Sequence, residues 1–203
     1  MKVQKIWSVI GVLMLAFASL NVSAQASVAS PHQVVEKVTT DLLAEVKKSA
    51  ELLKSDPDQY FADIEKILEV VVDFEFIAKN VMGVYWQKAT PAQQAQFVKV
   101  FKRGMVKTYA KGMANYADLK IEVLPAEGEV AEYGKVTVMQ KVTAADGINR
   151  VAYTMGRRNE PNAQWQLINV VLDGVNLGLT FRSQFAQLVK EHEGNLDASI
   201  AAW

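Results

Sequence analysis

The chain has 203 residues, of which 22 are basic, 22 are acidic and 50% are hydrophobic. This charge balance disfavours a nucleic-acid-binding protein, because such proteins carry a basic excess that pairs with phosphates. Cysteine is absent, which excludes disulfides, thiol catalysis and thiolate metal sites.

The first 24 residues have the pattern of a cleavable secretory signal peptide. Lys2 and Lys5 supply the positive start, Ile6–Leu20 is an uncharged apolar run, and small residues lead up to Ala24. The apolar run is shorter than the roughly 20 residues of a membrane-spanning helix. We expect cleavage after Ala24, with cleavage after Ala26 or an uncleaved anchor as the alternatives.

The remaining residues, 25–203, are expected to form one exported domain. Loss of the two lysines leaves this part with a formal charge of −2. Its length suits a single hydrophobic core, and it contains no internal repeat and no linker rich in proline and glycine.

Apolar residues spaced three or four apart predict most of the helices. The expected ranges are 31–54, 57–71, 74–83, 91–116, 180–191 and a short helix that ends near residue 203. Four residues that commonly cap helices stand before four of these segments, namely Asp56, Asp73, Thr90 and Asn195. Thr90 with Gln93 completes a capping box, and Pro91 suits the first helical position.

Alternating apolar and polar residues predict strands over 119–123, 135–142, 150–155 and 165–172. The connections are short and rich in turn residues, so an antiparallel meander is expected. Asp173–Gly174 is interpreted as the turn between the last strand and a helix. The sequence therefore predicts an α+β fold with a sheet of about four strands, helices on one face and an NTF2-like shape able to enclose a cavity.

Catalytic patterns are weak. The two histidines, His32 and His192, have no sequence neighbours that suit a metal or a general base. The pairs Glu65/Glu69 and Asp73/Glu75 are better explained as surface charge, with Asp73 as a cap. These residues give no support to an enzyme.

A stripe of large side chains runs along the helix predicted from Thr90, and its members are each four residues apart: Phe97, Phe101, Met105, Tyr109 and Met113. For any single residue a packed core is the favoured explanation, and the two flexible methionines also suit a deformable apolar cavity. The spacing leaves both interpretations open.

Three segments resemble the MlaC, or toluene-tolerance auxiliary, family of periplasmic phospholipid-binding proteins of the Mla pathway. They are VDFEFIAKNVMGVYWQKATPAQQAQFVKVFK at 72–102, TYAKGMANYADLKIEVLP at 108–125, and WQLINVVLDGVNLGLTFRSQFAQLV at 165–189. The terminal GNLDASIAAW also fits. Together these segments cover most of the chain after the signal peptide, in the family's order.

The resemblance implies a monomeric carrier in the periplasm, with a phospholipid as cargo, no cofactor, no metal and no catalytic activity. It would shuttle a glycerophospholipid between outer and inner membranes and so maintain outer-membrane lipid asymmetry. Its implied partners are an outer-membrane lipoprotein–porin complex and an inner-membrane ABC transporter with an MCE ring protein. Such cargo calls for a cavity near the upper end of ordinary pocket sizes.

The resemblance also suggests where the lipid would bind. The expected lipid-binding residues are the helix stripe and one face of the sheet: Phe97, Phe101, Met105, Tyr109, Met113, Val138, Val151, Tyr153, Trp165 and Leu167. The opposite sheet face is the alternative, with Ala152, Ile168 and Val170. Arg150 and Arg182 are the candidate headgroup ligands, and Arg157 and Arg158 are further candidates. An envelope enzyme with a cavity-type fold and a chaperone-like protein remain the alternative functions.

Overall fold

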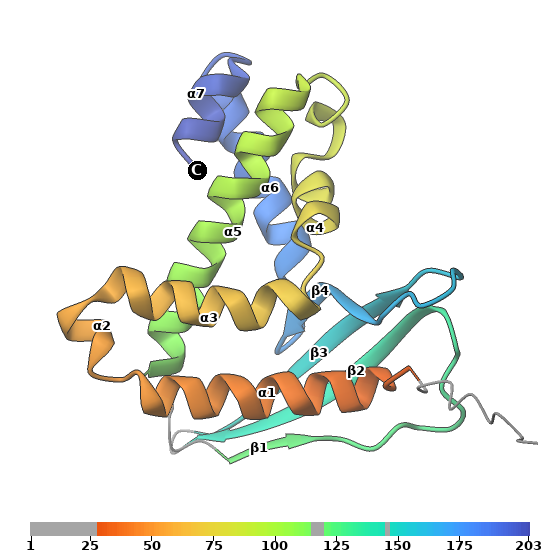
Figure 1. The fold of residues 1–203 in the computed structure, drawn as a ribbon. Coiled ribbons are helices and arrows are strands. Elements are labelled where there is room, and N and C mark those ends of the chain that lie inside the picture. The colour runs from red at the N-terminus through yellow and green to blue at the C-terminus, as the bar shows by residue number, and fades with distance from the viewer. Residues whose placement is uncertain (1–27, 115–119, 145–146) are drawn as a thin grey trace, which may run out of the picture.

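The computed structural model, which describes residues 28–114, 120–144 and 147–203, has an antiparallel sheet with helices on one face (Figure 1). The strands follow chain order across the sheet and are β1 (Lys120–Val123), β2 (Gly134–Ala144), β3 (Gly147–Arg157), β4 (Gln166–Leu172) and β5 (Val175–Asn176). This arrangement confirms the predicted α+β fold and meander. β5 was not predicted.

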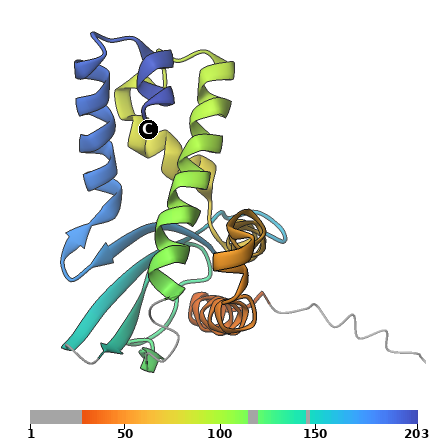
Figure 2. The ribbon, with the colours of Figure 1, turned by 90° about the vertical axis from the view of Figure 1, so that its left-hand side faces the viewer.

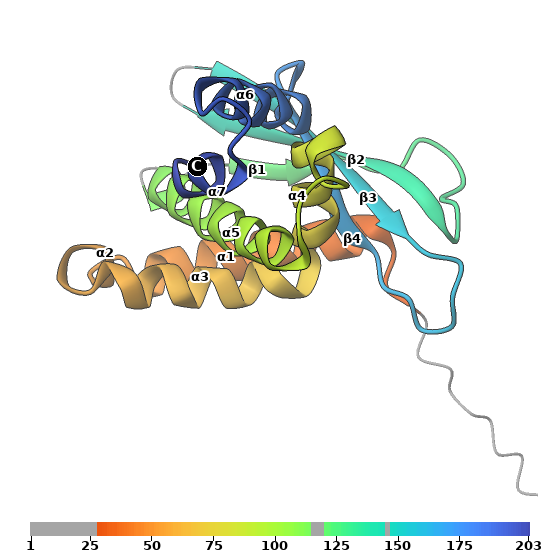
Figure 3. The ribbon, with the colours of Figure 1, turned by 90° about the horizontal axis from the view of Figure 1, so that it is seen from above.

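The helices form two groups. Two long helices lie side by side in Figure 1 and contact the sheet or its edge, and a short helix joins them: α1 (Pro31–Lys48), α2 (Leu52–Ser55) and α3 (Pro57–Val71). The others form a lobe that extends away from the sheet: α4 (Phe74–Met82), the 3-10 helix η1 (Gly83–Tyr85), α5 (Pro91–Ala114), α6 (Leu177–Glu191) and α7 (Leu196–Ala201). Seen from above in Figure 3, α5 lies between α6 and the α1–α3 pair.

The helix starts follow the predicted caps. Asp56 accepts a hydrogen bond from the Gln59 amide at 3.1 Å, and Asp73 accepts one from the Phe76 amide at 2.9 Å. Thr90 and Gln93 exchange the two hydrogen bonds of a capping box. These bonds satisfy amides that the first turn of a helix leaves without an internal partner.

Two helix boundaries differ from the prediction. The helix predicted over 31–54 is interrupted after Lys48, where the Ser49 hydroxyl and amide both donate to the Glu45 carbonyl. The helix predicted from residue 180 starts at Leu177 instead. The predicted end of the long helix near residue 116 and the signal peptide lie outside the described residues.

The Asp173–Gly174 turn joins β4 to β5 rather than directly to a helix. Its residues have φ of 47° and 84°. Two successive positive φ values are those of a type I′ turn, whose twist matches a tight β-hairpin. The chain therefore makes one short added strand before α6 begins.

The core consists of three packed groups that meet at Phe74. An aromatic cluster, defined as Phe97, Phe101, Phe181, Phe185 and Trp203, fills the helical lobe. A second group packs α1 and α3 against α5, and a third lies between α1 and the sheet. Phe74 packs against all three groups. No helix among the described residues is both long and apolar enough to cross a membrane.

Candidate functional site

A cavity of about 310 Å³ lies where the helical lobe meets the sheet. Its walls come from α1, α3, α4, α5, α6, β3, β4 and Val72. The lining residues are Leu42, Ile64, Leu68, Val72, Phe74, Ile77, Phe101, Met105, Val106, Tyr109, Ala110, Val151, Tyr153, Leu167, Asn169, Val170, Leu172, Leu177, Gly178 and Phe181. Nearly all are hydrocarbon or aromatic, so the cavity suits an apolar ligand.

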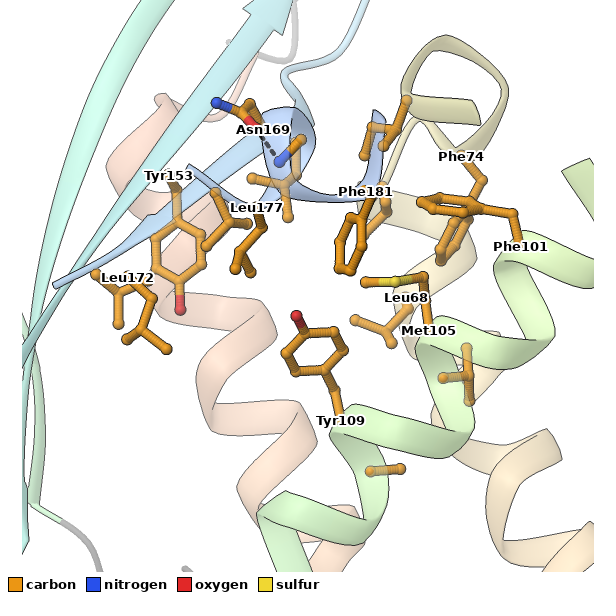
Figure 4. A pocket seen from close by; sticks show the side chains of 18 of the residues that line it. Leu68, Phe74, Phe101, Met105, Tyr109, Tyr153, Asn169, Leu172, Leu177 and Phe181 are labelled. Carbon is orange, nitrogen blue, oxygen red and sulfur yellow. Dashed lines mark hydrogen bonds between the residues drawn. The ribbon is translucent and has the colours of Figure 1, made fainter. Parts of the chain in front are cut away.

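The helical wall follows from the four-residue spacing of the α5 stripe. Residues four apart lie on the same side of a helix, so Phe101, Met105 and Tyr109 all reach the cavity. Figure 4 shows Met105 and Tyr109 directed toward the space opposite Leu177 and Phe181. Tyr109 is 37% exposed, which places it at the rim.

The sheet wall depends on a β-bulge in β4. On β3, Val151 and Tyr153 face the cavity with the usual period of two. On β4, pairing with β3 skips Ile168, so that Leu167 and Val170 both line the cavity although they are three residues apart. The cavity wall thus combines a residue from each of the two faces considered from the sequence. Ala152 and Ile168 are not among its lining residues.

The other expected lipid-binding residues are placed elsewhere. Phe97, Val138 and Trp165 are buried in the packed core and do not line the cavity. Phe97 belongs to the aromatic cluster, whereas Val138 and Trp165 pack with Met155 in the core group between α1 and the sheet. The side chain of Met113 lies outside the described part of the chain.

A polar contact that was not predicted from the sequence joins α6 to the sheet. The Asn169 Oδ1 accepts a hydrogen bond from the Gly178 amide at 3.3 Å. A Cβ atom at position 178 would lie 2.6 Å from that oxygen, so only glycine permits this approach. The sequence signal for this contact is Gly178 itself, which follows the Asp173–Gly174 turn by four residues.

The four candidate headgroup arginines stand away from the cavity wall. Arg157 donates to the backbone carbonyls of Ala163 and Glu132, and Arg158 lies 3.6 Å from Glu160. Arg182 lies close to Gly83 and is exposed. Arg150 is exposed, and its amide is bound by Asp173. Within the described residues, the wall carries no charged side chain.

A buried chain of hydrogen bonds connects the cavity wall to α1. The Tyr153 hydroxyl donates to Gln140 Oε1 at 2.8 Å, and Gln140 Nε2 donates to Thr39 Oγ1 at 2.9 Å. Gln140 is only 2% exposed, so each of its bonds replaces one that water would otherwise supply. Burial raises the pKa of Tyr153 to about 12. This chain fixes one side of the cavity.

Stability should therefore fall at high pH through Tyr153. Its pKa is about 10 in the unfolded chain and about 12 in the folded protein, so the stabilisation is complete below pH 10. It is lost as the pH rises toward 12, by at most about 1.4 kcal/mol per pH unit. Denaturant titrations at several pH values measure this slope.

Tyr153→Phe is the matched variant for this prediction. It should cost about 1 kcal/mol at neutral pH through the lost hydrogen bond and reduce the slope above pH 10. Burial also raises the pKa values of Tyr60 and Tyr109, so part of the slope should remain. An unchanged slope in Tyr153→Phe would contradict the assignment.

The carboxylates of Glu65 and Glu69, one of the two pairs considered in the sequence, have a structural role. Lys102 forms ion pairs with Glu65, at 2.8 Å, and with Glu69, and so joins α5 to α3. Hydrogen bonds to these two carboxylates raise the pKa of Lys102. Across the described ranges, no group of three His, Asp or Glu side chains is placed to hold a metal ion.

The cavity volume differs from the expectation. The resemblance implied a cavity near the upper end of ordinary pocket sizes, whereas about 310 Å³ lies at the lower end.

Comparison with known proteins gives a consistent set of relatives. A family model described as MlaC protein matches residues 36–203. The toluene tolerance protein ttg2D of Pseudomonas putida is 36% identical over 194 residues, which cover 95% of this chain and 86% of that protein. The intermembrane phospholipid transport system binding protein MlaC of Haemophilus influenzae is 22% identical over 149 residues, which cover 73% of this chain and 69% of that protein.

A solved structure has the same fold. It is a phospholipid-binding protein from Ralstonia solanacearum in complex with a phospholipid, and it matches with a TM-score of 0.74 and 25% identity. The match covers 86% of this chain and 98% of that chain.

Proposed function

Because the chain belongs to the MlaC protein family, we propose that it is a non-enzymatic carrier that holds a glycerophospholipid by its acyl chains in the apolar cavity. The single observation that carries the proposal is a cavity bounded by hydrocarbon and aromatic side chains between the sheet and the helical lobe. The phospholipid named for the solved relative supports the class of cargo.

The energetics of acyl chains explain the need for such a carrier. Two chains contain roughly 30 methylenes, each worth about 0.8 kcal/mol when removed from water. Exposure of both chains to water therefore costs on the order of 20 kcal/mol. A protein wall that matches the apolar interior of a bilayer removes this cost. Transfer between two membranes then needs little energy at the carrier itself.

Loading requires the cavity to widen. A volume of about 310 Å³ is at the lower end of ordinary pocket sizes, whereas a two-chain lipid contains roughly 30 methylenes. The side chains that must give way stand on the α5 and α6 walls, where Met105 and Phe181 meet the cavity. Met105 is unbranched and changes shape easily. We therefore expect the protein to adapt to the length of the chains.

The family assignment supports a proposal for the cellular role. We place the protein in the periplasm, exported by residues 1–24 as a cleaved signal peptide, and as a monomer formed by residues 25–203. It passes lipid between an outer-membrane lipoprotein–porin complex and an inner-membrane ABC transporter with an MCE ring protein. Docking to either complex uses the outer surface and leaves the cavity for lipid.

The test is the lipid content of the protein purified from cells without added lipid. We expect about one phospholipid per chain, because release into water is strongly unfavourable. Native mass spectrometry gives the stoichiometry, and mass spectrometry of a solvent extract identifies the lipid. Lipid-free protein whose thermal stability does not respond to added phospholipid would overturn the proposal.

A further inference from the structure

A second hollow lies between α5 and α6 and has a different lining from the cavity. This α5–α6 groove has a volume of about 770 Å³. Its polar side chains are Thr108, Ser183, Gln184, Gln187 and Glu191, and Trp203 also lines it. Figure 2 shows the two helices standing apart, with α7 between them at the end away from the sheet. The groove thus has a larger share of polar side chains than the cavity, whose lining is mostly hydrocarbon and aromatic.

The groove is continuous with the cavity. Met105, Tyr109 and Phe181 line both. Tyr109 stands at the rim, and Figure 4 shows its hydroxyl directed toward Phe181 and Leu177. A molecule with an apolar end in the cavity therefore reaches the groove as soon as it passes these three side chains.

The polar groups of the groove are not equally engaged. Ser183 donates to the Leu179 carbonyl, and Gln187 donates to Glu191. Thr108 and Gln184 form no side-chain hydrogen bond with other described residues, and both are exposed. Their hydroxyl and amide groups are suited to donate to the ester and phosphate oxygens of a ligand.

The groove and the cavity together fit the two ends of one lipid, and this assignment rests on the function proposed for the cavity. We propose that the α5–α6 groove binds the polar end of the same phospholipid, its glycerol and phosphate, while the acyl chains occupy the cavity. Among the described side chains that line the groove, only Glu191 is charged at neutral pH. The phosphate is thus recognised by neutral hydrogen-bond donors. The exposed guanidinium of Arg182, the competing candidate, lies against Gly83 of η1.

Cysteine placement tests this assignment cleanly because the natural chain has no cysteine. The protein is loaded with a phosphatidylethanolamine whose headgroup carries a maleimide. A thiolate in reach adds across the maleimide double bond, forming a carbon–sulfur bond while a proton is taken up by the adjacent carbon. The adduct is counted by mass spectrometry of the intact protein.

Two matched pairs of single-cysteine variants are compared. Gln184→Cys faces the groove, whereas Arg182→Cys lies two residues away and so on about the opposite side of α6. On α5, Thr108→Cys faces the groove, and Arg103→Cys lies on the far side, near Asp58. We expect each groove cysteine to react at least about tenfold faster than its partner. Free N-ethylmaleimide, which measures accessibility alone, should react with all four at similar rates.

The outcomes separate the groove from the carrier function. Equal lipid-directed rates, or faster reaction of Arg182→Cys, would overturn the groove assignment while leaving the carrier intact. The groove assignment would also be overturned, and the carrier function retained, if no variant reacts although native mass spectrometry finds one lipid bound. Protein that retains no maleimide lipid and no natural phospholipid would overturn the carrier function, and the groove assignment with it.

Discussion

Replacing Met105 with tryptophan is expected to weaken phospholipid binding roughly 30-fold while the protein stays folded. Met105 borders both the cavity and the α5–α6 groove, so an indole there takes space that acyl methylenes need. Exclusion of two or three methylenes at about 0.8 kcal/mol each costs about 2 kcal/mol, and 1.4 kcal/mol is a factor of ten in affinity. The measurement is the partition of a labelled phospholipid between vesicles and delipidated protein.

The fold should tolerate this change because Met105 faces open space instead of a filled core. Overpacking in a tight core costs 1–3 kcal/mol, and we expect less than about 1.5 kcal/mol here. Met139→Trp is the matched control: Met139 neighbours Ala152 on a face of the sheet that does not line the cavity. It should leave lipid binding unchanged. Normal binding by Met105→Trp, or loss of binding only together with unfolding, would show that this position is plain core.

Local signals in the sequence were enough to predict most of the helix starts and the order of the four long strands. A cap such as Thr90, with Pro91 and Gln93 behind it, depends on residues within one turn, and the structure has the expected bonds. The alternation in β3 likewise depends only on neighbouring residues. The structure agrees with both predictions because contacts with distant residues do not change this helix start or the alternation in β3.

The sheet wall of the cavity could not be predicted in the same way. A period of two assigns Leu167 and Val170 to opposite faces, but the bulge at Ile168 brings both to the cavity. The bulge is a property of the pairing between β3 and β4, which a single strand does not encode. Sequence reasoning therefore left the two faces of β4 as alternatives.

The helix stripe shows the same limit. Phe97 and Phe101 are one turn apart and look equivalent in the sequence, yet only Phe101 reaches the cavity. Phe97 packs against Phe185 and Trp203, which come from α6 and the end of the chain. Phe101 also packs against Trp203, but it borders the cavity as well. Spacing predicts which face of a helix is buried. Segments distant in the sequence determine whether the side chains on that face lie in the packed core or line a cavity.

Phe97→Ala is expected to lower the free energy of unfolding by about 3–5 kcal/mol, the usual cost of deleting a fully buried phenyl ring. Phe97 is 0% exposed. Its ring centroid lies 4.6 Å from that of Phe185 and 5.4 Å from that of Trp203, so the deletion leaves a void at the centre of the aromatic cluster. Denaturant titration of the delipidated protein, followed by circular dichroism, measures the change.

Phe76→Ala makes the same substitution at a ring that is 38% exposed on α4, and it should cost less than about 1 kcal/mol. A similarly small loss for Phe97→Ala would mean that the aromatic cluster does not hold the lobe together. Because Phe97 stands one layer behind the cavity wall, any Phe97→Ala protein that remains folded should still bind phospholipid. Met105→Trp should show the reverse, with the fold kept and phospholipid binding weakened. The two positions, eight residues apart on the same face of α5, thus separate what stabilises the protein from what holds its cargo.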